Sequence, residues 1–263
     1  MILYEDENWT LGLLLGQDYS HLKGQSRVKI ELDLWPSPLI SIPEQVHGCK
    51  IRDASDTKGC DGLIIKMPSS AVGVLSADCY SLALFGKSKG VLMHAGRQGV
   101  LNGILAQARA ALASEEELVL FIGPGIANYE IKGLVEQIRA LGYGAFLQGD
   151  CLDLRGIIRA QAEVLGITNI KDCDIDSASK AGFFSHRRGE AGRHLTYLYK
   201  KPDASMLARL LEAKAASFAD DLNYELALLL CQKKEEGFGF NEGLSGGLDL
   251  KELLQKLQDL EDL

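Results

Sequence analysis

The sequence lacks the features that mark several specialised classes of protein. Its six cysteines are scattered and form no CxxC pair, which argues against a disulfide framework. No apolar run reaches the ~18 residues of a membrane span, and the acidic residues 1–7 lack the basic start of a secretory signal. A net charge of −8 leaves no basic excess for nucleic acid. We therefore expect a cytoplasmic protein without a nucleic-acid or membrane partner.

Against this background, three side chains are candidate metal ligands, namely His47, Cys79 and His94. Cys79 follows the apolar run at residues 72–75, and His94 follows the run at residues 90–93. Short apolar runs bounded by Gly or Ser predict buried strands, which would hold both ligands rigidly. Three protein ligands leave a fourth position for water or substrate, which is the pattern of catalytic zinc sites. The alternative is a structural role, because buried cysteine often serves as a small apolar side chain.

A series of short motifs follows in order between about residues 44 and 193. The motifs are QVHG (45–48), DG (61–62), ADC (77–79), HAG (94–96), GPGI (123–126), FSHRR (184–188) and GR (192–193). Together they resemble the YfiH-like family, whose members are described as laccase-domain proteins, polyphenol oxidases or purine nucleoside phosphorylases. The resemblance implies one bound metal, usually zinc, held by His47, Cys79 and His94. The same donor atoms also suit copper.

The chain departs from the family pattern at two places. No Thr-Arg-x-Gly-Gly-like stretch precedes the QVHG motif, and Arg97 and Gln98 follow the HAG motif where the family usually has Trp and then Arg. The first departure removes an arginine that would help to hold phosphate, if the family uses it in that way. The second departure removes a flat side chain that would stack on a base or support the metal.

Other residues of these motifs are candidates for catalysis or positioning. Asp78 lies between an apolar run and Cys79, so we expect it to be partly buried, either in a catalytic role or hydrogen-bonded to nearby backbone. Gln45, which opens the QVHG motif, and the candidate ligand Cys79 are also included among the catalytic candidates. Asp61 either orients a ligand histidine or the substrate, or simply serves the Asp-Gly turn.

Cationic side chains gather around the FSHRR motif in an otherwise acidic chain. Arginine forms bidentate contacts with phosphate or carboxylate, so these side chains predict an anion site. The candidates for binding substrate or anion are Arg97, His186, Arg187, Arg188 and Arg193. The alternative is a solvated loop with salt bridges to Glu190 and its neighbours, which would stabilise little.

The alternation of strand-like and helix-like segments predicts an α+β protein, and the resemblance implies layered mixed β-sheets flanked by helices. We expect a laccase-type domain at residues 1–200 and a C-terminal helical extension at residues 201–263. Further strands are expected at residues 9–15, 28–34, 63–65 and 117–122. Helices are expected at residues 100–113, 134–141 and 155–165, and in the extension at residues 204–231 and 250–260, separated by a glycine-rich linker at 237–247.

The preferred hypothesis is a zinc-dependent enzyme that acts on purine nucleosides, by phosphorolysis of adenosine or inosine, by deamination of adenosine, or by both. The purine substrate comes from the resemblance, whereas the residues themselves indicate only a metal, an acid and cations. A copper-dependent polyphenol oxidase is the less favoured alternative, because multicopper chemistry needs more than the five histidines present. The sequence leaves the oligomeric state open.

Two further alternatives come from different classes. One is a metal-free thiol hydrolase or deamidase, in which His94 or His47 activates Cys79. The other is a cell-wall precursor editing factor with reduced activity, which the two departures from the family pattern would explain.

Overall fold

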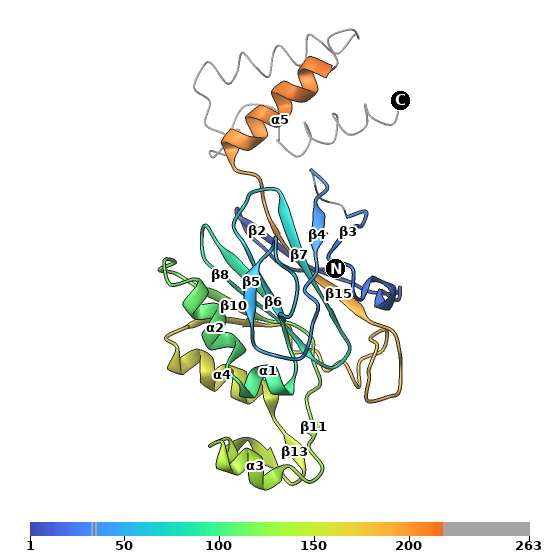
Figure 1. Cartoon of the computed structure of the whole chain (residues 1–263), viewed down its shortest axis with the longest axis vertical. Coiled ribbons are helices and arrows are strands. Elements are labelled where there is room, and N and C mark those ends of the chain that lie inside the picture. The colour runs from blue at the N-terminus through green and yellow to red at the C-terminus, as the bar shows by residue number, and fades with distance from the viewer. Residues whose placement is uncertain (33, 35, 218–263) are drawn as a thin grey trace. The chain divides into compact units, whose positions relative to one another are not determined.

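A computed structural model describes residues 1–32, 34 and 36–217 of the chain (Figure 1). The chain divides into two units, Met1–Lys201 and Pro202–Leu263. The domain boundary expected after residue 200 lies one residue from this division. In the second unit, helix α5 (Ala204–Ser217) is described. The remainder of the helix expected at 204–231, the linker and the last amphipathic helix lie outside the described residues.

Two mixed sheets form the body of the first unit. The first contains, in spatial order, β1 (Ile2–Glu5), β2 (Trp9–Leu14), β15 (His194–Lys200), β7 (Ser70–Ser76), β4 (Leu39–Ser41) and β3 (Arg27–Lys29). The second contains, in spatial order, β14 (Asn169–Asp172), β10 (Val119–Ile122), β8 (Tyr80–Phe85), β9 (Gly90–Ala95), β6 (Gly62–Ile65) and β5 (Ile51–Asp53). Most neighbouring strands are antiparallel, but β4 and β7 are parallel in the first sheet, and β10 and β14 as well as β5 and β6 are parallel in the second. The predicted α+β layered fold is confirmed.

The two sheets pack face to face around an apolar core. Trp9 and Leu198 of the first sheet meet Leu63, Phe85 and Phe121 of the second in one buried cluster. Because successive side chains of a strand point to opposite faces, the residues next to these along each strand point to the outer face of their sheet. Burying apolar surface stabilises a fold by ~25 cal/mol per Å², so this shared core is a main source of stability for the unit.

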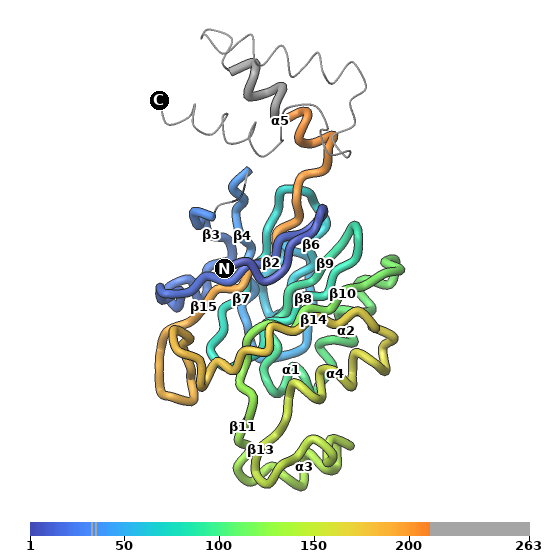
Figure 2. Tube along the Cα trace, turned by 180° about the vertical axis from the view of Figure 1, so that it is seen from behind, coloured from blue at the N-terminus to red at the C-terminus, as the bar shows by residue number. Residues whose placement is uncertain are grey.

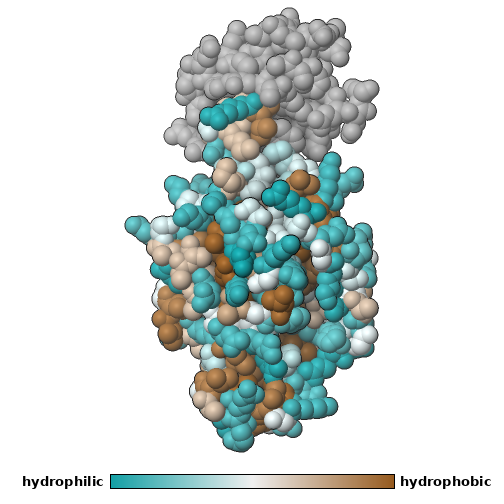
Figure 3. Space-filling model, in the orientation of Figure 1, coloured by the Kyte–Doolittle hydropathy of each residue, from teal (hydrophilic) through white to brown (hydrophobic). Residues whose placement is uncertain are grey.

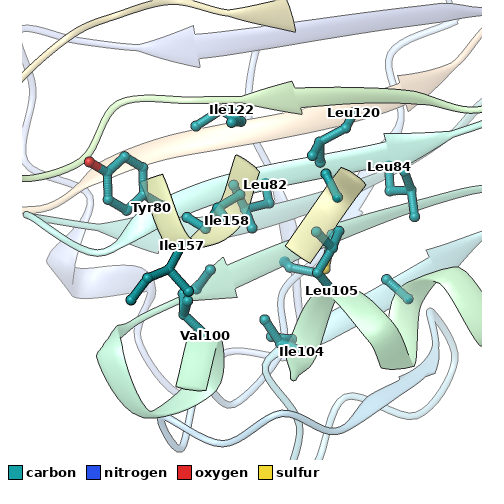
Figure 4. Close-up of a cluster of buried hydrophobic side chains, with 14 of the residues drawn as sticks. Tyr80, Leu82, Leu84, Val100, Ile104, Leu105, Leu120, Ile122, Ile157 and Ile158 are labelled. Atoms are coloured by element: carbon teal, nitrogen blue, oxygen red, sulfur yellow. The ribbon is translucent and has the colours of Figure 1, made fainter. Parts of the chain in front are cut away.

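Helices cover the outer face of the second sheet, which is therefore buried on both sides (Figure 4). The covering helices are α1 (Arg97–Leu101), α2 (Ile104–Ala111) and α4 (Leu154–Val164). Figure 4 shows Leu82 and Leu84 of β8 in the same buried cluster as Leu105 of α2 and Ile158 of α4. A strand buried on both faces carries a continuous apolar run. Such runs predicted β6, β9 and β10 of this sheet, whereas β8, although buried throughout, was not predicted.

The helix expected at residues 100–113 is instead two helices, so this prediction was wrong in its continuity. Gly103, between α1 and α2, has a left-handed φ of 80°. An Asn-Gly pair readily adopts this conformation and interrupts a helix. The helix expected at 155–165 is confirmed as α4, and Asp153 caps its start by accepting a hydrogen bond from the backbone N–H of Gly156 at 2.8 Å.

A small third sheet is formed by the segment that also contains the remaining α-helix of this unit. It consists of β11 (Tyr129–Glu130), β13 (Cys151–Leu152) and β12 (Leu147–Gln148), and lies in sequence around α3 (Val135–Ala140) (Figure 2). Two short 3-10 helices are η1 (Ser20–Leu22) and η2 (Gly144–Phe146). The surface in the view of Figure 3 is largely hydrophilic, with an apolar area over the α3 region, where Leu141 is exposed.

The sequence pattern misjudged two strands of the first sheet. The strand expected at 28–34 ends at Lys29, which pairs with Leu39 of β4. The next position would face Pro38, which has no N–H to continue the ladder. Strand β15 was not predicted at all, although it lies between β2 and β7.

No helix among the described residues is both long and apolar enough to cross a membrane.

Candidate metal centre

Three segments that are distant in sequence bring together the three candidate ligands. His47 lies in the connection between β4 and β5, Cys79 lies between β7 and β8, and His94 lies near the end of β9. The ligand atoms of these residues, which we call the ligand cluster, all lie within 4.8 Å of one another. The rings of His47 and His94 meet edge to face, with 4.8 Å between their centroids. Within the part of the chain that the structure describes, this is the one such group of His, Cys, Asp or Glu side chains.

The register of the second sheet explains how Cys79 meets His94. Tyr80, the first residue of β8, pairs with Ala95 of β9, so Cys79 lies opposite Gly96. A Cβ atom at Gly96 would lie 3.1 Å from the Cys79 sulfur and close to the His47 ring. This close approach leaves no room for a side chain, which is the physical reason for a glycine beside the cluster.

One buried carboxylate organises both histidines. Asp61 is fully buried, and its oxygens accept hydrogen bonds from His94 Nδ1 at 2.9 Å, from the backbone N–H of His47 at 2.9 Å and from that of Gly48 at 2.7 Å. Asp61 reaches His94 because the next residue, Gly62, pairs with Met93 across β6 and β9. Of the two roles that the sequence left open for Asp61, these contacts match the orienting one.

The bonds to Asp61 also set the chemistry of the histidines. Because an ionised carboxylate can only accept, His94 donates its Nδ1 proton to Asp61, so Nε2 is the ring nitrogen that would bind a metal, once its own proton has left. His47 has a left-handed φ of 61°, which is uncommon for a residue with a side chain. Its backbone bond to Asp61 holds this conformation, and such strain is commonly found where function demands a fixed geometry.

The electrostatics of the cluster favour a thiolate. Burial raises the pKa of Cys79, but hydrogen bonds from His47 and His94 outweigh it and bring that pKa down to about 6. Burial lowers the pKa of His94, while its bonds to Asp61 and Cys79 raise it to about 9. The thiolate is the form of cysteine that binds metals and attacks electrophiles. The cluster therefore has its sulfur ready for either chemistry at neutral pH.

The arrangement fits a single divalent metal ion. Bonds of ~2.0–2.3 Å from nitrogen and sulfur require donor atoms within roughly 4 Å of one another, close to the separations found here. Two imidazoles and one thiolate suit zinc or copper rather than magnesium or calcium. His94 is buried whereas His47 is exposed, so the cluster faces solvent on the His47 side. Three protein ligands with an accessible side correspond to the open coordination of catalytic sites.

Asp78, the residue before Cys79, uses its carboxylate to bind a later segment of the same chain. It is buried, and its oxygens accept hydrogen bonds from the Ser177 hydroxyl at 2.8 Å, the Ser185 hydroxyl at 3.0 Å and the Arg187 backbone N–H at 2.7 Å. It thereby ties the loop that carries the FSHRR motif to the residue before Cys79. Ser185 belongs to the FSHRR motif, but no sequence pattern pairs either serine with Asp78, because both lie about a hundred positions away.

Gln45 bonds to the backbone of β7 rather than pointing its amide at the ligands. Its Nε2 donates to the carbonyl of Leu75 at 2.7 Å, and its Oε1 accepts from the N–H of Leu75 at 2.9 Å. This paired bond fixes the start of the QVHG segment against the first sheet. Gln45 itself has a left-handed φ of 60°, so the bond also stabilises an uncommon backbone conformation.

The candidate cations do not all meet at one place. Residues 183–193, which we call the arginine loop, hold Arg188 and Arg193. Arg188 binds Glu190 through two nitrogens at 3.0 Å each and donates to the carbonyl of Ser177 at 3.1 Å. Arg193 donates to carbonyls of its own loop, including that of Ala191 at 2.8 Å. Both side chains therefore serve the structure of the loop.

Two of the cations do converge, on a residue that the sequence did not single out. The guanidinium carbons of Arg97 and Arg187 lie 5.8 Å and 5.5 Å from the centre of the Tyr129 ring. His186, the residue before Arg187, is exposed to solvent. Tyr129 follows the GPGI motif by only three residues, but a single tyrosine in a short strand carries no distinctive pattern.

A protein-family model described as multi-copper polyphenol oxidoreductase laccase matches residues 11–201 of the chain. A purine nucleoside phosphorylase of Campylobacter jejuni is 37% identical over 172 residues, which cover 60% of this chain and 76% of that protein. A purine nucleoside phosphorylase of Deinococcus radiodurans is 32% identical over 166 residues, which cover 57% of this chain and 65% of that protein, just under two thirds of its length.

Solved structures share the fold. A Neisseria meningitidis protein of the family model DUF152 superimposes with a TM-score of 0.60 at 16% identity, covering 76% of this chain and 98% of that one. The YfiH protein of Bacillus licheniformis superimposes with a TM-score of 0.53 at 24% identity, covering 62% of this chain and 74% of that one. At these identities the likeness concerns the arrangement of the sheets and helices alone.

Proposed function

The chain belongs to the multi-copper polyphenol oxidoreductase laccase family, and from this premise we propose that it is a zinc-dependent enzyme acting on purine nucleosides at the ligand cluster. The convergence of two imidazoles and one thiolate within 4.8 Å is the observation that carries the proposal. The substrate class rests on the relatives, which are named purine nucleoside phosphorylase.

The family name refers to several copper ions, but this chain supports one metal. It has five histidines, and the described residues provide a single cluster of suitable ligands. A multicopper oxidase would need further imidazoles to hold its other ions. We therefore prefer one zinc ion to a set of coppers, with copper as the alternative occupant.

Each residue has a role in this proposal. His47, Cys79 and His94 would hold the metal, which when bound supplies Lewis acidity to an oxygen atom at the open position. Asp61 keeps both histidines in place through its three hydrogen bonds. The catalytic role expected of Asp78 and Gln45 stays a prediction, and their hydrogen bonds support positioning instead.

Two reactions on a purine nucleoside are compatible with this site. In phosphorolysis, a phosphate oxygen bonds to C1′ of the ribose as the bond from C1′ to the purine nitrogen breaks. The purine leaves with that electron pair and takes up a proton. In deamination, water replaces the 6-amino group of adenosine, which leaves as ammonia. Only the first reaction requires an anion site beside the cluster, and the cations described above favour it.

The test is a nucleoside assay on the purified, zinc-loaded protein. Adenosine and inosine are incubated with and without phosphate, and the products are separated by HPLC. We expect free purine base to appear only when phosphate and zinc are both present. Inosine formed from adenosine without phosphate would indicate deamination, and no product from either nucleoside in the zinc-loaded protein would contradict the proposal.

A second candidate, a metal-free thiol hydrolase or deamidase, is favoured by one specific observation. The pKa of Cys79 near 6 and the adjacent imidazoles give the reactive pair that such enzymes use. Treatment with a chelator separates the two: it abolishes turnover by the metal enzyme, whereas a thiol enzyme keeps or gains activity on amide substrates.

A further inference from the structure

The ring of Tyr129 contacts two cationic side chains that come from distant segments. Arg97 opens α1 directly after the HAG motif, and Arg187 lies in the arginine loop. Both guanidinium groups lie within ~6 Å of the ring centre, the range in which a cation is attracted to an aromatic face. The ring thus gathers two positive charges in a protein whose net charge is −8.

The charge of Arg97 has no acidic partner. Its Nε is buried and makes no hydrogen bond, and no carboxylate within the described ranges forms an ion pair with its guanidinium. A half-buried guanidinium loses hydration, and that loss is normally offset by a carboxylate or by several acceptors. The chain has 36 acidic residues, so an arginine without an acidic partner points to an acceptor that a bound ligand supplies.

The acid nearest to the pair is already shared. Glu130 accepts from Arg187 at 2.6 Å and from Lys132 at 3.3 Å, so two cations share this carboxylate, and Arg97 adds a third positive charge at the Tyr129 ring. Asp78 lies behind the loop, where its oxygens are taken by two serine hydroxyls and the Arg187 backbone N–H. The region therefore keeps a positive surplus.

The geometry of the backbone places this surplus against the ligand cluster. Arg97 directly follows Gly96, where an added Cβ would lie 3.1 Å from the Cys79 sulfur. The backbone of Arg187 is held by Asp78, the residue before Cys79, at 2.7 Å. Each arginine thus starts from a point next to the metal site, and its planar fork of N–H donors matches the oxygens of a phosphate.

We propose that Arg97 and Arg187, set on the Tyr129 ring beside the ligand cluster, form a subsite for a phosphate group. The inference rests on the proposed function for the reaction in which this phosphate takes part. The phosphate is either free inorganic phosphate, the attacking reactant of phosphorolysis, or the 5′-phosphate of a purine nucleotide. Both present the same tetrahedral oxyanion to the two arginines.

The experiment is isothermal titration calorimetry on the zinc-loaded protein with three probes: inorganic phosphate, adenosine 5′-monophosphate and adenosine. The variants are Arg97→Gln, Arg97→Lys and, as a matched surface control, Arg52→Gln, whose guanidinium pairs with Asp56 outside the site. Arg97 makes no hydrogen bond in the described chain, so its replacement should leave folding intact; thermal melting and zinc content check this for each variant.

We expect wild-type protein to bind inorganic phosphate and Arg97→Gln to bind it about 10- to 100-fold more weakly, the usual loss for a charged hydrogen bond. Arg97→Lys should fall between them, because it keeps the charge without the fork, and Arg52→Gln should match wild type. If only the monophosphate binds and loses affinity in Arg97→Gln, the subsite takes a nucleotide. Equal binding of both phosphate probes by Arg97→Gln and wild type, or binding of neither probe by wild type, would overturn the proposal.

The titration separates the failure of the subsite from the failure of the enzyme. Binding is measured with one reactant at a time, so it does not depend on turnover. Phosphate binding that needs Arg97, without purine release in the nucleoside assay, would keep the subsite and reject the enzyme. Purine release with an unchanged KM for phosphate in Arg97→Gln would keep the enzyme and reject the subsite.

Discussion

The ligand cluster and the arginine loop both stood out in the sequence, yet their side chains behave in opposite ways. In the cluster, three residues from separate segments point at one another and share the support of Asp61. In the loop, Arg188 binds Glu190 and the carbonyl of the nearby Ser177, and Arg193 binds carbonyls of its own loop. Arg187 instead reaches a distant segment, at Tyr129 and Glu130.

The difference lies in the hydrogen bonds that each arginine would lose if it turned toward a ligand. Arg188 already satisfies its donors with a bidentate carboxylate and with carbonyls that would otherwise lack partners. Arg97 has no such partners, so its N–H groups remain available to donate to a ligand. A dense cationic motif therefore indicates an anion site only where the structure leaves its donors unsatisfied.

The largest expected effect comes from removing the sulfur of the cluster. Cys79→Ser replaces a thiolate by a neutral hydroxyl, so we expect bound metal to fall from a full equivalent to near zero, with nucleoside turnover lost as well. Elemental analysis of the purified variants measures this directly. Cys173→Ser, a half-buried thiol outside the cluster, is the control and should keep its metal. Undiminished metal in Cys79→Ser would defeat the site assignment.

The next effect tests the carboxylate that supports both histidines. Asp61→Asn keeps the size of the side chain but weakens its hold on His94 and His47, so metal affinity should fall by about 10- to 100-fold. Competition with a chromogenic chelator measures the affinity. Asp53→Asn, an exposed acid that pairs with Lys66, should leave the affinity unchanged. The orienting role of Asp61 is rejected if both variants bind metal like wild type.

The acidity of the cluster thiol can be tested by alkylation. In metal-free protein the rate of iodoacetamide labelling at Cys79 should reach half its plateau near pH 6, because its thiolate is stabilised by the two histidines and is the reactive form. Burial raises the pKa of Cys60 to about 11, so that thiol should stay unlabelled at neutral pH. Mass spectrometry locates the label. Added zinc should protect Cys79, and labelling that begins only above pH 8 would contradict the thiolate assignment.

The smallest expected effect separates the two neighbouring arginines of the loop. Arg188→Gln removes several bonds that hold the loop together, so the melting temperature should drop by a few degrees, while Arg187→Gln should change it less. Thermal denaturation followed by circular dichroism compares them. Metal content should stay the same in both variants. If Arg187→Gln proves the more destabilising, the distinction between Arg188, which holds the loop together, and Arg187, which pairs with Glu130, is wrong.

Much of the fold could be predicted because its strands are buried on both faces. The runs at residues 72–75 and 90–93 became β7 and β9, and the run before the GPGI motif became β10. Continuous apolar sequence identifies such strands without knowledge of their partners. Strand β15 escaped because its place between β2 and β7 depends on pairing with residues more than a hundred positions away.

The sequence by itself determined the chemistry that is available: one cysteine and two histidines at the ends of apolar segments, and arginines near one late motif. The tertiary structure alone decided how these groups are used. Asp61 reaches two histidines because β6 pairs with β9, and the arginines divide their roles because each finds different acceptors nearby. The reason is physical: apolar periodicity is written in neighbouring residues, whereas the convergence of polar side chains depends on sheet register between segments far apart in the chain.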